Sequence, residues 1–385
     1  ILIVEEGTPQ VEKVHLEPCY TFVVGGSGLI GTQLREALAY TGLPITTLSR
    51  SKPEDLKEKE LAIKLDLSTA TTEQLYQIIN LLRPERISYL AAWTDVKAAI
   101  ALSRIFQEYL ILSEIGLSTA DPIYATNVRA VRNICEAIER LPEENRPELI
   151  IANTTFTQIE AVKQNNWYAQ TKAKGMAIAR TFTEIELQEV LFGYPYSTRA
   201  IESSRAKGST LHWWITEILD KIQNPPQEEG EKLTPFNDDA VDHTNIHHVM
   251  RSLLRGEGYD FHRGWLTTTQ VARIIIEEYC KLHGGDANEL KEAILNPVSG
   301  DNYKPTVSKL LSEDNPVYQW LRQAAESQRI PFEQLLALKV DYARAYPKAT
   351  DQEIEMSDPD NLTDPYIKQL RSDISQIVKN ILEAK

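Results

Sequence analysis

A tyrosine and a lysine four residues apart, Tyr168 and Lys172, are the side chains of this sequence best suited to proton transfer. They lie in a stretch from Trp167 to about Glu186 that we expect to form a long helix, and residues four apart on a helix share one face. A nearby ammonium group favours the phenolate and lowers the pKa of a tyrosine. We therefore expect Tyr168 to be a general acid or base that Lys172 tunes.

Two threonines, Thr154 and Thr155, could hold a substrate oxygen beside this tyrosine. They follow Leu149 to Ala152, a short apolar run typical of a strand. The YxxxK spacing is common in proteins and carries little weight alone. Here it follows a strand that ends in hydroxyl groups and, earlier in the chain, a glycine-rich turn. That order favours a catalytic role for Tyr168 with Thr154 or Thr155.

The glycine-rich turn lies within Thr21 to Gly31, TFVVGGSGLIG, where a short strand leads into a helical pattern. Gly25 permits a tight turn, Gly28 lets backbone approach a pyrophosphate, and Gly31 lets the helix pack close to the strand. The phosphates would meet the free N–H groups at the start of the helix. This context predicts dinucleotide binding, and the alternative is a tight turn between buried elements.

The end of the next expected strand, Pro44 to Leu48, bears on which dinucleotide binds. An acidic residue there holds the ribose 2′-hydroxyl of NAD, whereas a basic one accommodates the 2′-phosphate of NADP. This chain has Ser49, Arg50 and Lys52 at that point, which favours NADP(H) over NAD(H). The same residues would also suit a solvated loop.

Two later strand ends extend the expected cofactor site. Asp66, near the end of Leu61 to Leu67, is placed to accept a hydrogen bond from adenine, or to serve as a turn or helix-capping residue. The strand Ile87 to Ala92 ends in small residues, as backbone that passes a cofactor requires. The expected cofactor-binding residues are Gly25, Gly28, Leu29, Ile30, Gly31, Ser49, Arg50, Lys52, Asp66, Leu67, Ala91, Ala92 and Lys172.

Strands and helices alternate through the first half of the chain, which predicts an α/β fold with a doubly wound parallel (Rossmann) sheet. Other expected elements are a helix over Thr71 to Leu82, helical stretches over 97–120, a helix that Asn127 opens, a strand over Glu189 to Phe192, a loop over Tyr194 to Ser197 and a helix over Leu211 to Ile222. We divide the chain into a leader (1–19), a dinucleotide-binding domain (20–200) and a smaller, mainly helical C-terminal substrate domain (201–385).

Composition narrows the class of protein. The chain has 385 residues and a formal net charge of -14, which argues against a broad nucleic-acid surface. Its three cysteines form no metal or redox motif and suit a reducing compartment, so we expect a cytoplasmic protein. No apolar run is long enough to span a membrane, and the opening ILIV is followed at once by acidic residues, unlike a signal peptide.

Several residues are secondary candidates. Arg199 and Arg205 could clamp a substrate phosphate or carboxylate, or be exposed helix charges. Trp93 and Tyr194, beside the expected site, are further substrate candidates. Three histidines, His243, His247 and His248, lack the partner spacing of a metal site, and surface or helix-start positions are the expected alternative. Trp213 and Trp214 are expected to pack in the core or between domains.

These motifs together resemble those of the extended short-chain dehydrogenases/reductases, the superfamily of nucleotide-sugar epimerases, dehydratases and reductases. The resemblance covers about residues 20–200 and rests on motifs in the family's order. AAWTDV is most similar to the dTDP-4-dehydrorhamnose reductase branch. The motifs are VVGGSGLIG, LDL, LAAWTDV, ATNVRAVRN, the NTT strand end and YAQTKAKG.

The resemblance implies a role for each matching residue. Gly25, Gly28 and Gly31 would hold the pyrophosphate, and Asp66 would meet the adenine. Tyr168 would be the acid/base, and Lys172 would hold the nicotinamide ribose. Thr154 best matches the family's catalytic Ser/Thr, with Thr155 as the alternate. Ala91 and Ala92 would line the cofactor, and Asn127 matches a structural position behind the site.

The sequence also departs from the family pattern. The segment between Thr154 and Tyr168 is short, and the stretch from Phe106 to Ala120 resembles an insertion. The strand before Tyr194 lacks the arginine often found there, and the family's late acidic motif reads Asn245-Ile-His-His-Val here. These departures leave the substrate class more open than the cofactor class.

The expected function is therefore an NADP(H)-dependent reductase that acts on a carbonyl or activated enone of a nucleotide sugar or secondary metabolite. Two alternatives stay open. One is an epimerase or dehydratase that retains NAD, and the other is a regulatory protein that binds NADP without turnover. We expect neither a nucleic acid nor a membrane as partner. Family members often pair through the helices that carry the positions of Asn127 and Tyr168, which makes a homodimer one expectation.

Overall fold

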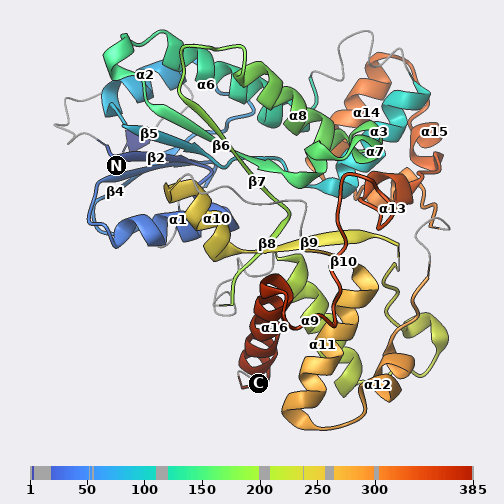
Figure 1. Ribbon diagram of the computed structural model, residues 1–385. Coiled ribbons are helices and arrows are strands. Elements are labelled where there is room, and N and C mark those ends of the chain that lie inside the picture. The colour runs from blue at the N-terminus through green and yellow to red at the C-terminus, as the bar shows by residue number, and fades with distance from the viewer. Residues whose placement is uncertain are drawn as a thin grey trace.

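The computed structural model describes residues 2–3, 19–51, 53, 56–109, 120–198, 209–236, 238–255, 264–298 and 303–383. Three bodies can be followed in Figure 1: a sheet covered by helices, a helical region below it around the C-terminus, and a small helical group beside the sheet. No helix of the described ranges has the length and apolar character needed to cross a membrane.

Seven parallel strands form the main sheet, in the order β1-β4-β3-β2-β5-β6-β7. Without the two-residue edge strand β1, this is the strand order of a doubly wound dinucleotide-binding sheet, so the predicted fold class is confirmed. The edge strand lies in the unassigned leader. The strands are β1 (Leu2–Ile3), β2 (Thr21–Val24), β3 (Ile45–Ser49), β4 (Glu60–Lys64), β5 (Arg86–Tyr89), β6 (Glu148–Thr154) and β7 (Leu187–Phe192).

Helices cover both faces of this sheet (Figure 1). Helices α2 (Thr72–Leu82), α6 (Ala130–Glu139) and α8 (Trp167–Ala179) bury apolar side chains against one face. Helices α1 (Leu29–Ala39) and α10 (Ile246–Arg255) cover the other. In α2 the buried residues recur at helical spacing, namely Leu75, Ile78, Ile79 and Leu82.

The ends of α2 follow the signals in its sequence. Thr71 and Gln74 form a capping box at the start, with each side chain bonded to the other residue's backbone N–H. Arg83, at φ 46°, ends the helix in the left-handed region, just before Pro84. A helix over Thr71 to Leu82 was predicted, and the structure confirms it.

Two other helices differ from their predicted extents. Asn127 does not open a helix. It lies inside the π-helix η2 (Ala125–Arg129), which joins α5 (Pro122–Tyr124) to α6. The helix that bears Tyr168 ends at Ala179 rather than near Glu186, because the chain turns there toward β7. A 3-10 helix, η4 (Thr155–Gln158), and α7 (Glu160–Asn165) fill the short segment before α8.

A second sheet of three strands was not predicted. It has the order β10-β9-β8 and comprises β8 (Tyr194–Tyr196), β9 (Ala240–Asn245) and β10 (Trp265–Thr267). The predicted loop at Tyr194 is thus a strand, because its backbone pairs with a segment about 50 residues later in the chain. Helices α9 (Thr210–Gln223), α11 (Thr268–His283), α12 (Ala287–Ile294) and α16 (Pro365–Glu383) share an apolar core with this sheet.

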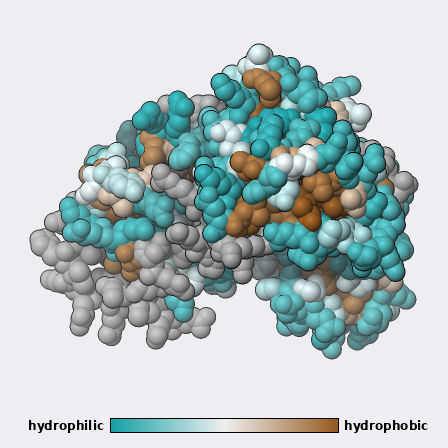
Figure 2. Space-filling model, turned by 90° about the horizontal axis from the view of Figure 1, so that it is seen from below, coloured by the Kyte–Doolittle hydropathy of each residue, from teal (hydrophilic) through white to brown (hydrophobic). Residues whose placement is uncertain are grey.

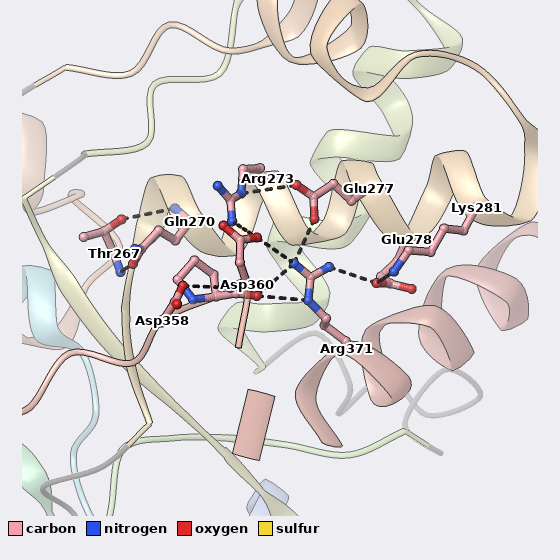
Figure 3. Close-up of polar contacts among 10 residues, drawn as sticks. Thr267, Gln270, Arg273, Glu277, Glu278, Lys281, Asp358, Asp360 and Arg371 are labelled. Carbon is pink, nitrogen blue, oxygen red and sulfur yellow. Dashed lines mark hydrogen bonds and ion pairs between the residues drawn. The ribbon is translucent and has the colours of Figure 1, made fainter. Parts of the chain in front are cut away.

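A buried arginine links helices α11 and α16 (Figure 3). Arg371 of α16 pairs with Glu277 at 2.8 Å and Glu278 at 3.1 Å, both on α11. It also donates to the Pro359 carbonyl at 3.0 and 3.2 Å. Because every contact lies within the C-terminal region, this cluster stabilises that region and makes no contact with the main sheet. Asp360 of the same loop pairs with Arg273 at 2.7 Å.

The third body is a helical group that returns to the main sheet. Helices α13 (Val307–Leu310), α14 (Pro316–Ser327) and α15 (Phe332–Ala337), with the 3-10 helix η8 (Tyr342–Ala345), pack on α3 (Val96–Glu108). The division at residue 200 stays a prediction, and residues 199–208 lie outside the described ranges.

Where described residues are seen from below the view of Figure 1, their surface is mostly hydrophilic, with a few hydrophobic patches (Figure 2). Trp213, predicted to be a packing residue, is 52% exposed and contacts Trp214 edge to face. Trp214 itself packs against the core of the C-terminal region, as predicted.

Candidate active site

A cleft of about 860 Å³ runs along the ends of the parallel strands, where ligands of doubly wound sheets bind. Its volume is in the range of small-molecule and cofactor sites. Residues that were predicted separately meet along it. They are Gly25, Gly28, Leu29, Ile30, Gly31, Ser49, Arg50, Asp66, Leu67, Ala91, Ala92, Trp93, Thr154, Tyr168 and Tyr194.

Five predicted residues are not among those lining the cleft. Lys172 and Thr155 are buried behind it. Lys52, Arg199 and Arg205 lie outside the described residues. The substrate roles proposed for the two arginines therefore rest on the sequence alone.

The glycine turn is shaped by close backbone contacts. Gly25 has φ +91°, and a Cβ there would lie 2.7 Å from the Ala91 nitrogen. A Cβ on Gly31 would lie 2.4 Å from the Gly25 carbonyl oxygen. At Gly28 the nearest atom would be 3.5 Å away, so this position has room on the cleft side. The contacts of Gly25 and Gly31 agree with a tight turn and close helix packing, whereas the approach of a ligand at Gly28 stays a prediction.

The start of α1 is open to the cleft. Its N-cap residue, Gly28, has no side chain to cap the first N–H groups, and the first turn has no acidic residue. The helix therefore directs free N–H groups and its positive end into the cleft beside Leu29 and Ile30. This chemistry fits the pyrophosphate of a dinucleotide.

A buried ion pair supports the turn from below. Arg35 of α1 meets Glu60 of β4 at 2.5 and 2.8 Å, with both side chains fully buried. The Arg35 guanidinium also donates to the Gly26 carbonyl at 3.4 Å. Burial is the largest single influence on Glu60 and opposes its ionisation, but the hydrogen bonds from Arg35, Thr47 and the Lys57 backbone together with the charge of Arg35 lower its pKa. Sequence reasoning missed this pair, because no local pattern links residues 25 positions apart.

Ser49, Arg50 and Asp66 line the cleft where the adenosine of a dinucleotide was predicted to bind. The Ser49 hydroxyl donates to the Ser51 carbonyl at 2.7 Å. Asp66 accepts from the backbone N–H and the hydroxyl of Ser68 at 2.9 and 2.8 Å, so it is the turn residue that was the alternative prediction. Because its carboxylate also lines the cleft, the geometry leaves the predicted contact with adenine available.

Tyr168 and Thr154 meet at the other end of the cleft. Thr154 is the last residue of β6, and Tyr168 lies in the first turn of α8. Burial raises the pKa of Tyr168 to about 12, while the nearby Thr154 side chain lowers it in part. We predicted instead that Lys172 would lower this pKa. That prediction is wrong for the structure described here, because burial of the phenol dominates.

Lys172 lies one turn after Tyr168 but is engaged elsewhere. Its ammonium donates to the Ala152 carbonyl of β6 at 2.6 Å. Burial lowers the pKa of Lys172 to about 8, against the charge of Glu189, which raises it. This bond holds α8 to the end of β6, and so sets the distance between the helix that bears Tyr168 and the strand that bears Thr154.

Of the two threonines, Thr154 is the one that reaches the cleft. The Thr155 side chain is fully buried, and its hydroxyl has no hydrogen-bond partner among the described residues. The structure thus favours Thr154 as the residue beside the phenol.

Asn127 braces the loop after β5. Its side-chain oxygen accepts from the Trp93 backbone N–H at 2.8 Å, and its amide donates to the Trp93 carbonyl at 3.4 Å. The amide also donates to the Thr171 hydroxyl of α8 at 3.1 Å. A π-turn inside a helix frequently marks a functional region. Here the π-helix places the Asn127 side chain where it can bond both to the loop after β5 and to α8.

Asp121 positions the start of α8 through Trp167. One carboxylate oxygen caps α5, accepting from Ile123 at 2.8 Å and Tyr124 at 3.0 Å. The other accepts from the Trp167 indole at 3.0 Å. Burial raises the pKa of Asp121 to about 7, despite these bonds. Sequence reasoning missed this residue, whose only signal is an Asp-Pro pair before a helix.

Asp121 should make the stability of the fold depend on pH. Its pKa is 3.8 ordinarily and about 7 when folded, so the native state binds the extra proton in this range. The free energy of unfolding should therefore fall between about pH 4 and pH 7, by up to about 4 kcal/mol for this group. In Asp121→Asn this contribution should vanish. Chemical denaturation at several pH values measures it, and parallel pH profiles for the two proteins would contradict it.

Aromatic rings lie at the end of the cleft beside Tyr168. Phe156 and Tyr194 line it and contact each other at 5.8 Å between ring centroids. Tyr346 of the third body packs on Phe156 at 6.2 Å, and its hydroxyl meets that of Tyr342 at 2.8 Å. Segments almost 200 residues apart thus build the wall beside Tyr168.

The histidines form no metal site. Within the described ranges, no group of His, Cys, Asp and Glu side chains could hold a metal ion. His247 is a helix-start residue, as predicted, but His243 is a buried residue of β9. Burial lowers the pKa of His243 to about 3, so it stays neutral.

No protein-family model and no curated protein matches the sequence. Solved structures do match the fold. The Bordetella bronchiseptica enzyme WbmH, in complex with NAD+, has a TM-score of 0.50 and 12% identity over 73% of this chain and 86% of its own. The dTDP-4-dehydrorhamnose reductase of Bacillus anthracis, in complex with NADP, has a TM-score of 0.48 and 14% identity over 74% and 84%. The UDP-glucose 4-epimerase of Thermus thermophilus, in complex with NAD, has a TM-score of 0.49 and 16% identity over 72% and 86%.

Identities this low establish the fold and not the reaction. The match to WbmH and the strand order of the main sheet agree on a doubly wound architecture. The chain therefore has the doubly wound, dinucleotide-binding (Rossmann) fold that the sequence predicted.

Proposed function

We propose that the protein is an NADP(H)-dependent reductase that acts on a carbonyl, or an activated enone, of a nucleotide sugar or secondary metabolite. One observation carries the proposal. A single cleft is lined by an uncapped helix start at the glycine turn and, at its other end, by Tyr168 and Thr154. The first feature suits a dinucleotide, and the second suits proton transfer to a substrate oxygen.

Each residue has its own role in the proposed reaction. A dinucleotide, when bound, supplies the hydride from its nicotinamide ring. Thr154 holds the substrate oxygen, and Tyr168 gives it a proton as charge develops there. Since burial keeps the phenol protonated well above neutral pH, Tyr168 is suited to the role of acid. Lys172 would hold the nicotinamide ribose and fixes α8 against β6.

The preference for NADP(H) is supported by the end of β3. Ser49 and Arg50 stand there, with no carboxylate at the position that would hold a ribose 2′-hydroxyl. Arg50 is exposed and makes no ion pair with another described residue, so its guanidinium is available to a 2′-phosphate.

Arg50→Ala should weaken the binding of NADPH more than that of NADH, by roughly 10-fold. A hydrogen bond to a charged group contributes about 1.5 kcal/mol or more, and only NADPH has the 2′-phosphate. Fluorescence titration with each nucleotide measures the ratio of the two dissociation constants. An unchanged ratio would mean that Arg50 does not read the 2′-phosphate.

The decisive experiment starts from the purified protein. It is denatured, any released nicotinamide nucleotide is identified, and the emptied protein is titrated with NADPH and NADH and then assayed with a panel of carbonyl compounds. Oxidation of NADPH supports the reductase. Tightly held NAD would favour an epimerase or dehydratase. NADPH binding without turnover on any compound would favour a regulatory protein. A homodimer stays a prediction, which the mass of the protein in solution tests.

A further inference from the structure

Arg50 and Trp93 approach each other across the cleft. The guanidinium carbon of Arg50 lies 5.6 Å from the centroid of the Trp93 ring, and both residues line the cleft. A guanidinium within about 6 Å of a ring centroid is attracted to the ring face. Neither residue was predicted to contact the other, because they lie 43 positions apart in the chain.

The topology of the sheet fixes what this contact spans. Arg50 follows β3, Trp93 follows β5, and β2 lies between these two strands. Strands two places apart are separated by about 10 Å. The strand they flank is the one that ends in the glycine turn, where the pyrophosphate of a dinucleotide would sit. The contact therefore passes over that position.

One end of the contact is fixed and the other is free. Both backbone polar groups of Trp93 are held by the Asn127 side chain, at 2.8 and 3.4 Å. Arg50 is exposed and has no ion-pair partner among the described residues. The exposed arginine side chain can thus move aside to admit a ligand, while the backbone of Trp93 is held by Asn127.

We propose that Arg50 and Trp93 form a strap that closes over the pyrophosphate of the bound dinucleotide and slows its release. This inference rests on the proposed function, in that the cleft must bind a nicotinamide nucleotide. A guanidinium can stack on a ring through its face while the N–H groups at its edge donate to phosphate oxygens. Arg50 can therefore keep its contact with Trp93 while it binds the ligand.

The test measures the release of NADH, which lacks the 2′-phosphate and so isolates the strap from cofactor choice. NADH is displaced by excess NAD+ in a stopped-flow instrument, and its own fluorescence reports the rate. Arg50→Ala and Trp93→Leu should each raise the release rate about 3- to 10-fold, as expected for one cation–π contact. The double variant should release NADH no faster than the faster single variant, because both changes break the same contact.

Two further variants sharpen the result. Arg50→Lys keeps the charge but loses the planar group, and should release NADH at a rate between those of the wild type and Arg50→Ala. Arg140→Ala is the matched control, since Arg140 lies 4.1 Å from the centroid of the Tyr76 ring, away from the cleft. It should release NADH like the wild type. Thermal melting of each variant checks that the fold is retained.

Four outcomes would overturn the strap. Unchanged release in both single variants would remove it while leaving nucleotide binding in place. Faster association with unchanged release would make the pair an obstacle at the entrance instead. Additive effects in the double variant would mean that the two residues act independently. Failure of the wild type to bind NADH or NADPH would overturn the strap and the proposed function together.

Discussion

Tyr168→Phe is expected to lower kcat by about 10²- to 10⁴-fold, the range that general acid–base catalysis contributes. The substitution removes one hydroxyl and keeps the ring, which packs with both the α3 cluster and the cluster around Phe156. The affinity for NADPH should stay unchanged, because the glycine turn and Arg50 lie at the other end of the cleft. Steady-state kinetics with the best carbonyl substrate and a binding titration measure the two effects separately.

Tyr342→Phe is the matched control for this result. It removes a phenol hydroxyl that pairs with Tyr346 at 2.8 Å but is not among those lining the cleft. Its kcat should match that of the wild type. If Tyr168→Phe turns over at a rate close to wild type with its cofactor bound, the acid role of Tyr168 is excluded.

The same assay decides between the two threonines. Thr154→Val should lower kcat, because it removes the hydroxyl that faces Tyr168. Thr155→Val should have little effect on kcat, because the Thr155 hydroxyl is buried and unpartnered, and an apolar group of the same shape suits that position. The reverse order of effects would assign the catalytic role to Thr155.

The parts of the site that the sequence predicted well are those encoded within a few residues. The glycine turn, the YxxxK pair and the threonines after β6 can each be recognised from the spacing of a few neighbouring residues. Strand order then brings them together, since the carboxyl ends of parallel strands meet at one edge of the sheet. A local pattern and one general rule of topology were thus enough to predict about half of the residues that line the cleft.

The features that were missed depend on partners far along the chain. The pairing of Arg35 with Glu60, of Asp121 with Trp167 and of Tyr194 with His243 of β9 has no local signature. The burial of a side chain likewise depends on segments that are far away in the sequence. The pKa of Tyr168 was expected to fall because Lys172 is close in sequence, but burial raises it.

Two glycines of the turn should separate cofactor binding from folding. At Gly28 the backbone is extended, with φ −77°, and an added Cβ would meet its nearest protein atom at 3.5 Å. Gly28→Ala should therefore fold normally. Its methyl group would stand where a pyrophosphate approaches, and overlap that costs about 1–3 kcal/mol should weaken NADPH binding roughly 10- to 100-fold. Isothermal titration and thermal melting of the same preparation measure both properties.

Gly31→Ala should behave differently, because its Cβ would meet backbone rather than open space. The Gly25 carbonyl oxygen would lie 2.4 Å away and the Gly26 Cα 2.6 Å away, and neither can move without shifting β2 or α1. This variant should lose about 1–3 kcal/mol of stability. If Gly28→Ala instead binds NADPH as the wild type does, the glycine turn serves only to pack the strand and the helix together. The cleft must then hold its ligand elsewhere. A pyrophosphate site predicts a contrast between the two variants. Gly28→Ala should lose NADPH binding and keep its stability, whereas Gly31→Ala should lose stability.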